Sequence, residues 1–265
     1  MSRVNFTSST KKMIIGSNKG ANLTLPTGER CYDFGGTDEH VRADGTCKVI
    51  NFNNKPHSVS VWFKTPAFTS PAYHALWSFT KSDDSNVRYW CSLAANGTIM
   101  IFGWKASSGR LWGSGSGLAL SDAGQDDNEW HHLLVTYNGS GTLKGYFDGG
   151  DPTSISVGAG TLIPDTCTIG ARLVGGGSIS FPVTGKIAQL GIFDYELSAI
   201  QAGIVYNSGK CFNERELFPE HYYTFGDGAD FKSFPTLIDH GRGAGNGTAT
   251  NMEAADMVAD HPGLD

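Results

Sequence analysis

Hydrophobic and polar residues alternate through two neighbouring runs near the middle of the chain, residues 130–137 and 142–147. In the first run both alternating sets are largely apolar, which favours an inner strand of a layered sheet. In the second run Leu143 and Phe147 alternate with the polar Lys144. The four residues between the runs read Asn-Gly-Ser-Gly and supply the positive-φ positions that a short hairpin loop needs. The pattern therefore predicts an antiparallel hairpin.

Short runs of the same kind recur along the chain, with turns rich in glycine, proline and asparagine between them. We expect further strands at residues 48–52, 57–64, 74–80, 87–94, 98–104, 110–113, 153–157, 167–171 and 185–194. Short strands at a spacing of about 8–12 residues are typical of an antiparallel sandwich or barrel. The glycine- and serine-rich stretch 114–125 is expected to be a loop.

One short helix is expected after the last of these strands. Ser198 and Gln201 have the spacing of a capping box, in which each side chain bonds the backbone N–H of the other residue. Gly209 is a plausible stop signal. The expected apolar stripe of this helix consists of Ile200, Ile204 and Val205.

Length and composition fit a β-rich globular chain. A chain of 265 residues forms one large β domain or two small domains. Glycine is abundant, with 35 residues, while proline contributes only 10 and aromatic residues reach 11%. This profile indicates many tight turns between short strands rather than disorder.

Charge and hydropathy exclude two classes of partner. The net charge is −6, only 17% of residues are charged, and no run of lysine or arginine occurs, so nucleic acid is not an expected partner. No apolar stretch approaches the roughly 20 residues of a membrane span. Residues 1–12 lack the apolar core of a secretory signal, so we expect synthesis in a cytoplasm without export.

The cysteines argue against metal and disulfide scaffolds. There are 5, widely spaced and without a Cys-x-x-Cys pair, so neither zinc nor a disulfide framework is expected. Buried thiols are the expected state. A single bridge between Cys31 and Cys47 is the alternative.

The central hairpin resembles a known family. Residues 130–132 (Trp-His-His), 135–137 (Val-Thr-Tyr) and 146–149 (Tyr-Phe-Asp-Gly) are similar to the central hairpin of laminin G-like, concanavalin A-like jelly-roll domains. Four flanking pieces agree in order, and the resemblance covers residues 30–207; the pieces are residues 33–38, 58–63, 168–171 and 181–197.

The resemblance implies an all-β fold, a two-sheet antiparallel jelly-roll sandwich with one short helix. We expect an N-terminal arm over residues 1–29, the laminin G-like domain over 30–209, and a C-terminal appendage over 210–265. The two terminal segments lack an apolar pattern of their own and are expected to be extended.

The C-terminal segment adds a functional expectation. Residues 222–228, 234–239 and 246–258 are similar to the end of laminin G-like structural proteins of tailed bacteriophages. The resemblance implies a non-enzymatic virion structural protein, a capsid decoration or fibre-like module located in the virion. Its partners would be other virion subunits, further copies of itself and surface glycans. The alternative is a soluble carbohydrate-binding lectin module, and a third reading is a polysaccharide hydrolase or lyase.

Candidate catalytic residues are sparse. A glycosidase needs two carboxyl groups about 5–9 Å apart across a cleft. Asp127 and Glu129 have the i, i+2 spacing that shares a strand face, but they precede the strand. His131 and His132 are adjacent, and neighbouring strand residues face opposite ways, so they are not expected to chelate one metal ion. We therefore expect no catalytic residue.

Aromatic residues provide a candidate sugar site, because sugar rings stack on aromatic faces. The alternative is that these rings fill the core or an oligomer interface, and for Trp62 and Trp130 we expect the core. The candidate carbohydrate-binding residues are Tyr89, Trp90, Trp104, Arg110 and Trp112.

Calcium is the one cofactor that the resemblance implies, because related sandwiches often hold an ion at a loop edge with carboxylates and carbonyls. Asp38 is the candidate ligand, and a turn-forming aspartate is the alternative. The family often has Asp-Glu in its closing strand, where this chain has Ala188 and Gln189.

Overall fold

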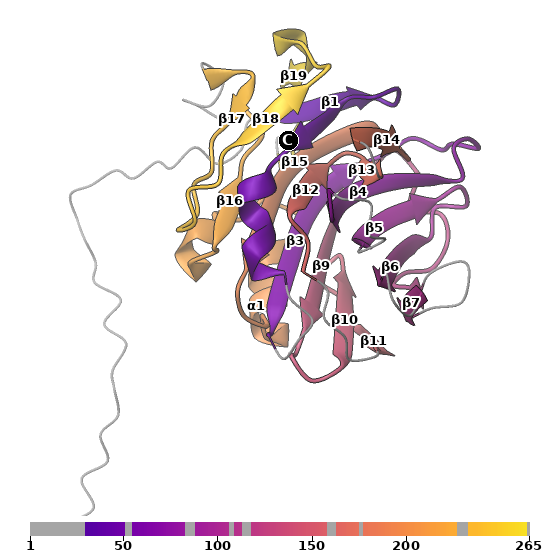
Figure 1. Ribbon diagram of the computed structural model, residues 1–265, viewed down its shortest axis with the longest axis vertical. Helices are drawn as coiled ribbons and strands as arrows, with labels where there is room; N and C mark the ends of the chain where they lie inside the picture. Colours follow the sequence, from indigo (N-terminus) through magenta and orange to yellow (C-terminus); the bar gives the residue numbers. More distant parts are fainter. Residues whose placement is uncertain are drawn as a thin grey trace, which may run out of the picture.

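The computed structural model describes residues 30–50, 55–82, 88–105, 109–112, 118–157, 163–174, 177–226 and 233–263. Its strands form two antiparallel sheets packed face to face, the predicted jelly-roll sandwich (Figure 1). The first sheet runs in the order β11 (Thr153–Ser156), β10 (Thr142–Phe147), β9 (His131–Tyr137), β3 (His57–Lys64), β15 (Thr184–Phe193), β1 (Cys31–Gly35) and β19 (Met257–Val258), and β16 (His221–Tyr223) also pairs with β15.

The second sheet completes the sandwich. It runs in the order β17 (Thr236–Leu237), β18 (Gly247–Thr250), β2 (His40–Arg42), β12 (Thr166–Ile169), β4 (Tyr73–Thr80), β5 (Arg88–Ala94), β6 (Ile99–Lys105) and β7 (Gly109–Trp112), and β8 (Leu118–Ala119) pairs with β6. A separate hairpin is formed by β13 (Arg172–Val174) and β14 (Ser178–Ser180).

The predicted central hairpin is confirmed. β9 and β10 pair with Tyr137 opposite Leu143, and the loop between them contains Gly139 and Gly141 at positive φ. β9 lies between β10 and β3, as its two apolar faces predict. Its inward residues join the main core between the sheets, while Leu134 faces outward into a second cluster.

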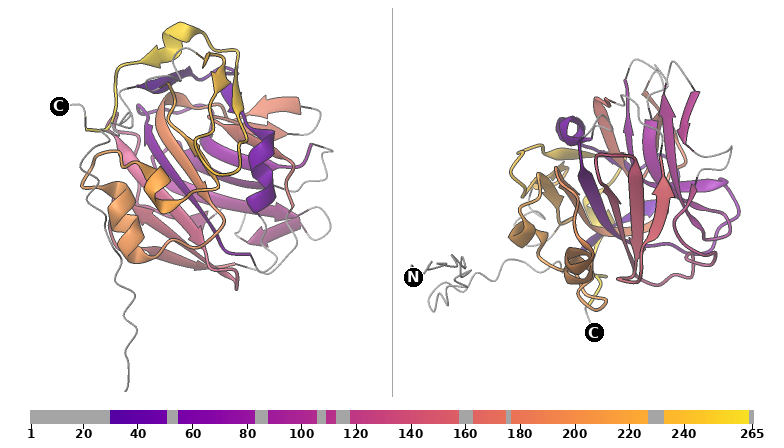
Figure 2. Two further views of the ribbon diagram at one scale, coloured as in Figure 1. Left: turned by 90° about the vertical axis from the view of Figure 1, so that its left-hand side faces the viewer. Right: turned by 90° about the horizontal axis from the view of Figure 1, so that it is seen from below.

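The outer face of the first sheet is covered by the single α-helix of the described residues, α1 (Ala199–Tyr206), and by the 3-10 helix η3 (Glu214–Leu217) (Figure 2). The capping box is confirmed, because Ser198 Oγ accepts from the Gln201 N–H and the Gln201 side chain accepts from the Ser198 N–H. The helix ends earlier than predicted: Asn207 adopts the left-handed conformation at φ 48°, and it caps the helix instead of Gly209.

The predicted apolar stripe of α1 is wrong at Ile200 and Ile204 and confirmed at Val205. Ile200 is 79% exposed and Ile204 is 40% exposed, whereas Ala202 and Val205 are buried. The small Ala202 faces the sheet. Val205 lies on the same side of the helix, because residues three or four positions apart share a helix face. The described part of the chain contains no helix long and apolar enough to cross a membrane.

One strand prediction and one loop prediction also change. Residues 44–49 form a 3-10 helix, η1 (Asp44–Val49), so the strand expected at 48–52 is wrong over its first two residues, and residues 51–54 lie outside the described part. Cys47 and Ile50 are both buried, and a three-residue spacing matches the 3-10 turn rather than strand alternation. The loop expected at 114–125 contains β8.

The cysteines are free and buried, as expected, so the alternative Cys31–Cys47 bridge is not formed. Burial raises the pKa of the Cys31 thiol to about 12, with Asp260 adding to the effect. Thiols in this state are poor nucleophiles, because the thiolate is the reactive form.

The segment from residue 210 onward adds strands to both sheets. β16 pairs with β15, β19 with β1, and β18 with β2. A buried hydrogen-bonded pair organises the segment: His221 Nδ1 lies 2.6 Å from Asp239 Oδ2, and both side chains are almost inaccessible. Asp239 also accepts backbone N–H groups from Tyr222, Gly241 and Gly245. The domain boundary at 209/210 stays a prediction.

A buried polar chain ties η3 to the first sheet. Ser60 Oγ donates to Glu214 Oε1 at 2.6 Å and lies 2.9 Å from His132 Nε2, so the histidine donates through Nε2. Glu214 Oε2 and His132 Nδ1 are buried without a hydrogen-bond partner. Burial raises the pKa of Glu214 to about 7 and lowers the pKa of His132 to about 3. A protonated Glu214 is therefore the form that this site favours.

Truncation after Gly209 is expected to abolish cooperative folding. Tyr223, Phe225 and Met257 belong to the main core, and deleting a buried aromatic side chain alone costs about 3–5 kcal/mol. Losing two buried aromatic side chains and a buried methionine together is comparable with the whole stability of a domain, about 5–15 kcal/mol. Thermal unfolding followed by circular dichroism checks this, and a soluble, cooperatively melting 1–209 chain would show instead that the segment is separable.

Glu214→Gln is expected to change how stability depends on pH. A carboxyl group whose pKa is raised from 4.5 to about 7 stabilises the folded state fully below pH 4.5 and loses that contribution as pH rises through 7. The full loss is about 3 kcal/mol. Urea unfolding from pH 4 to 9 should show the natural chain losing stability relative to the variant between pH 4.5 and 7, with a constant difference at higher pH. The exposed Glu216→Gln is the matched control in η3, and an identical pH profile for all three proteins would contradict the prediction.

Candidate functional site

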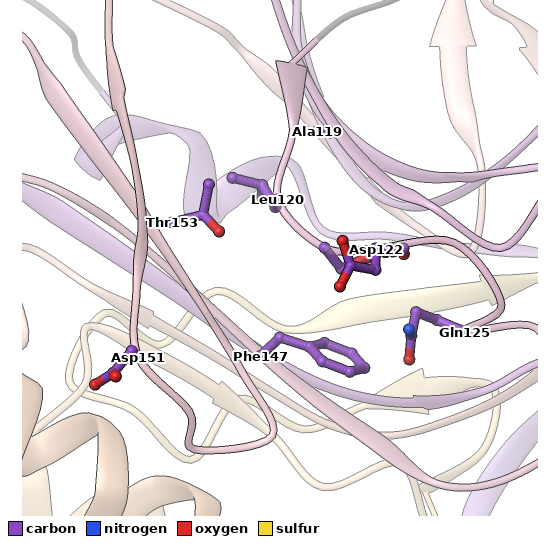
Figure 3. A pocket seen from close by; sticks show the side chains of 8 residues that line it. Ala119, Leu120, Asp122, Gln125, Phe147, Asp151 and Thr153 are labelled. Carbon is purple, nitrogen blue, oxygen red and sulfur yellow. Dashed lines mark hydrogen bonds between the residues drawn. The ribbon is translucent and has the colours of Figure 1, made fainter.

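A pocket of about 460 Å³ opens at one edge of the sandwich, between β8 with the loop after it and the ends of β10 and β11 (Figure 3). These segments close the edge because β8 pairs with β6 of the second sheet, while β10 and β11 form the outermost pair of the first. The residues that line the pocket are Ala119, Leu120, Ser121, Asp122, Gln125, Phe147, Asp151 and Thr153.

The aromatic ring of Phe147 points into the pocket from the last position of β10 (Figure 3). It is half-buried and packs against the main core. His131 lies behind it, with the two ring centroids 5.0 Å apart and the planes tilted by 33°. The ring is therefore packed against the protein and also lines the pocket, and a ring placed in this way can contact a sugar.

Hydrogen-bonding groups surround this ring. Asp122, Asp151 and Thr153 are exposed, and their side chains form no hydrogen bond or ion pair with other described residues. Gln125 donates weakly to the Ala123 carbonyl at 3.3 Å. Ser121 Oγ is already engaged, because it accepts from the Ile99 N–H and donates to the Asp122 carbonyl. Two carboxylates, a hydroxyl and an amide are thus available to a ligand.

A histidine bridge fixes the turn beside the pocket. His131 Nδ1 lies 2.7 Å from Asp148 Oδ2, and its Nε2 lies 3.1 Å from Asp127 Oδ1. Burial opposes the charged imidazole, but the two carboxylates outweigh it and raise the pKa of His131. Asp148 Oδ1 also accepts the His132 backbone N–H at 2.7 Å. Because the His132 side chain contacts Ser60 on the other face, the two histidines cannot bind one ion, as expected.

A second set of rings lies on the outer face of the second sheet. Trp90 of β5 stacks on Phe102 of β6, with parallel planes and centroids 4.4 Å apart. Tyr73 meets the edges of Phe102 and Phe181. The guanidinium of Arg172, from the β13–β14 hairpin, lies 4.9 Å from the Trp90 ring centroid and 4.4 Å from that of Phe181.

The residues predicted for sugar binding have different locations. Trp90 is on this outer face, but Tyr89 points the other way and is fully buried in the main core, so it offers no surface to a ligand. The backbone of Trp104 pairs with Arg88 and Arg110, and that of Trp112 with Gly103. The side chains of residues 104–112 lie outside the described structure, so their role stays a prediction.

The two tryptophans predicted for the core lie outside the main core, Trp62 buried and Trp130 partly buried. Trp62 is 1% exposed and packs with Cys31, Ala188 and Cys211 on the outer face of the first sheet. Trp130 packs against the same cluster and donates its indole N–H to Asp260 at 2.9 Å.

Asp38, the predicted calcium ligand, lies exposed in the turn after β1. Its Oδ2 accepts a hydrogen bond from the Asn251 amide at 2.8 Å, which occupies one carboxylate oxygen with a donor. Within the described residues no three His, Cys, Asp or Glu side chains are grouped to hold a metal ion. Calcium also takes backbone carbonyl oxygens as ligands, so calcium at Asp38 stays a prediction.

The pocket residues were missed by sequence reasoning. Residues 119–125 were predicted as a loop, and Phe147 as one member of an alternating strand. Residues 122 and 151 are 29 positions apart and meet only because β8 pairs with β6. The available signal was an aromatic residue at a strand end followed by an Asp-Gly-Gly-Asp turn.

Comparison with known proteins agrees with the fold. The sequence profile of the concanavalin A-like lectin/glucanases superfamily matches residues 34–202, more than half of the chain. The chain belongs to this family. No curated protein sequence matches it.

Solved structures are similar in fold at low identity. A proposed carbohydrate-binding protein from Bacteroides ovatus has a TM-score of 0.63 at 14% identity, covering 89% of this chain and 61% of that one. A native heptameric SAP-like pentraxin from Limulus polyphemus has a TM-score of 0.51 at 16% identity, covering 68% and 82%. The CBM40 of Ruminococcus gnavus IT-sialidase, bound to α2,3-sialyllactose, has a TM-score of 0.50 at 12% identity, covering 66% and 97%.

Proposed function

We propose that this chain is a non-catalytic carbohydrate-binding module and that the pocket beside Phe147 holds a sugar ring. One observation carries the proposal: an accessible aromatic ring lies in a pocket bordered by polar side chains that lack partners among the described residues. A volume of about 460 Å³ falls within the range of small-ligand sites, roughly 300–1,000 Å³.

The chemistry of the pocket suits a neutral saccharide. Sugar hydroxyl groups would donate to Asp122 and Asp151, and Thr153 can both donate and accept. Hydrogen bonds to a charged group contribute about 1.5–3 kcal/mol each. The lining includes two aspartates and no lysine or arginine, so an acidic sugar would meet like charge.

The family and the similar structures support sugar binding over the virion role. The family is named for lectins and glucanases, and two of the three similar structures bear carbohydrate-binding descriptions. That support is one of fold, because a sandwich of this type hosts several functions. The pocket residues themselves carry the assignment to this chain.

Hydrolysis is the second candidate, because two carboxylates line one pocket. Asp122 and Asp151 are both exposed to solvent. A glycosidase general acid is typically held in apolar surroundings that keep it protonated. The surroundings of these carboxylates therefore favour binding over bond cleavage.

Binding to an array of neutral oligosaccharides, followed by calorimetry with the best ligand, tests the proposal. Phe147→Ala is expected to weaken binding by 10-fold or more, and Asp122→Asn and Asp151→Asn by several-fold, since each removes one charged acceptor. Phe218→Ala is the matched control, because Phe218 is 71% exposed and lies outside the pocket. Full affinity in all three pocket variants would contradict this site, and chromatographic detection of cleaved ligand would favour the hydrolase.

The location of the module is a separate proposal. Similarity of residues 222–258 to tailed-phage proteins suggests a virion decoration or fibre-like module, made in the host cytoplasm and assembled with other virion subunits and further copies of itself. Mass spectrometry of purified particles of the encoding phage should detect this chain at a stoichiometric level. Its absence from the particles would contradict the virion role and leave sugar binding intact.

A further inference from the structure

The outer face of the second sheet carries a positively charged group that has no counter-ion among the described residues. Arg172 is half-buried, and its one hydrogen bond to a described residue runs from Nη2 to Ser180 Oγ at 3.2 Å. Its Nε is buried without a partner. Other arginines differ, since Arg42 pairs with Asp44 at 2.7 Å and Arg242 with Asp194 at 2.7 Å. The most enclosed of these three guanidinium groups is the one that has no ion pair.

Two aromatic rings hold this guanidinium in place. Its central carbon lies 4.9 Å from the Trp90 ring centroid and 4.4 Å from that of Phe181. Trp90 is itself fixed by parallel stacking on Phe102. The N–H groups of a guanidinium lie in its plane. Aromatic rings that contact its face therefore do not block them from binding a ligand. A planar fork of N–H donors fixed in this way matches a carboxylate.

Further donors on the same face lack acceptors. Trp90 Nε1 and Ser92 Oγ are buried and have no hydrogen-bond partner. Residues 90 and 92 share a strand face, because side chains alternate along β5. Burial, together with repulsion from Arg88, lowers the pKa of Arg172 to about 10, so the local charge is not compensated. The donors beneath the guanidinium are buried, so the group on this face that a ligand can reach is Arg172 itself, and its missing complement is an acceptor with negative charge.

We propose that Arg172 binds the carboxylate of an acidic saccharide at a second site, on the outer face of the β4–β5–β6 sheet, with Trp90 and Phe181 holding the guanidinium in position. The choice of a saccharide rests on the proposed function, whereas the choice of a carboxylate rests on Arg172 alone. The Phe147 pocket is lined by aspartates, so the two sites have opposite charge preferences.

Trigalacturonic acid and its fully methyl-esterified form are the matched probes, because the ester removes the charge and keeps the sugar chain. In calorimetry with the full chain, the acid is expected to bind at least 10-fold more tightly than the ester. Arg172→Gln should remove this preference, and Arg172→Lys should retain part of it, since lysine keeps the charge without the planar fork. Arg242→Gln, which removes an exposed arginine outside the proposed site, should bind like the natural chain.

Equal affinity for acid and ester, or an unchanged preference in a folded Arg172→Gln, would overturn the proposal. Tighter binding of a sulfated galactotriose than of the uronate would overturn the carboxylate assignment. If Arg172→Gln does not fold, the test is whether free galacturonate displaces trigalacturonate from the natural chain. Failure of galacturonate to compete counts against the site. Asp122→Asn separates the two sites: it should weaken neutral-sugar binding and leave acid binding unchanged, so either proposal can fail alone.

Discussion

The whole sandwich depends on strand alternation, because successive side chains leave a strand on opposite faces and only one face can enter the space between the sheets. Leu133 and Val135 of β9 enter the main core, while Leu134 between them packs under α1. The same parity divides β5, where Tyr89 is in the core and Trp90 on the outer face. A one-residue slip in register would exchange these sets and empty the core.

Each outer face is then covered in a different way. Over the first sheet, the short helix α1 and η3 bury a largely apolar cluster together with the Glu214–Ser60–His132 chain. Over the second sheet, the β13–β14 hairpin places a cationic side chain on aromatic rings. The first cover buries its polar groups beneath helices, and the second leaves a half-buried cationic group among aromatic rings. The charge on the second outer face is what makes it the candidate for an acidic ligand.

The two proposed sites lie where the sandwich is not closed by apolar packing. The Phe147 pocket forms at the edge where β8 and β10–β11 end, and it is lined by negative charge. The Arg172 surface is positive and lies on a sheet face. A module with both would distinguish neutral from acidic sugars by position, since the aspartates of the pocket would repel an acidic sugar and Arg172 would attract it. Binding of a chain that carries both kinds of sugar would then gain from occupying two sites at once.

The sequence by itself determined the β fold, the central hairpin and the cap at Ser198, because alternation, glycine turns and a capping box are local signals. It also separated the two histidines, since adjacent strand residues face apart. Tertiary structure decided the rest. Which apolar residues of α1 face the sheet followed from docking, so Ile200 is exposed and Ala202 buried. The pocket joins residues 122 and 151, and the Arg172 surface joins 90, 172 and 181, through strand pairing and hairpin placement. Such contacts leave no local pattern, because the distance in sequence between their members is set by topology alone.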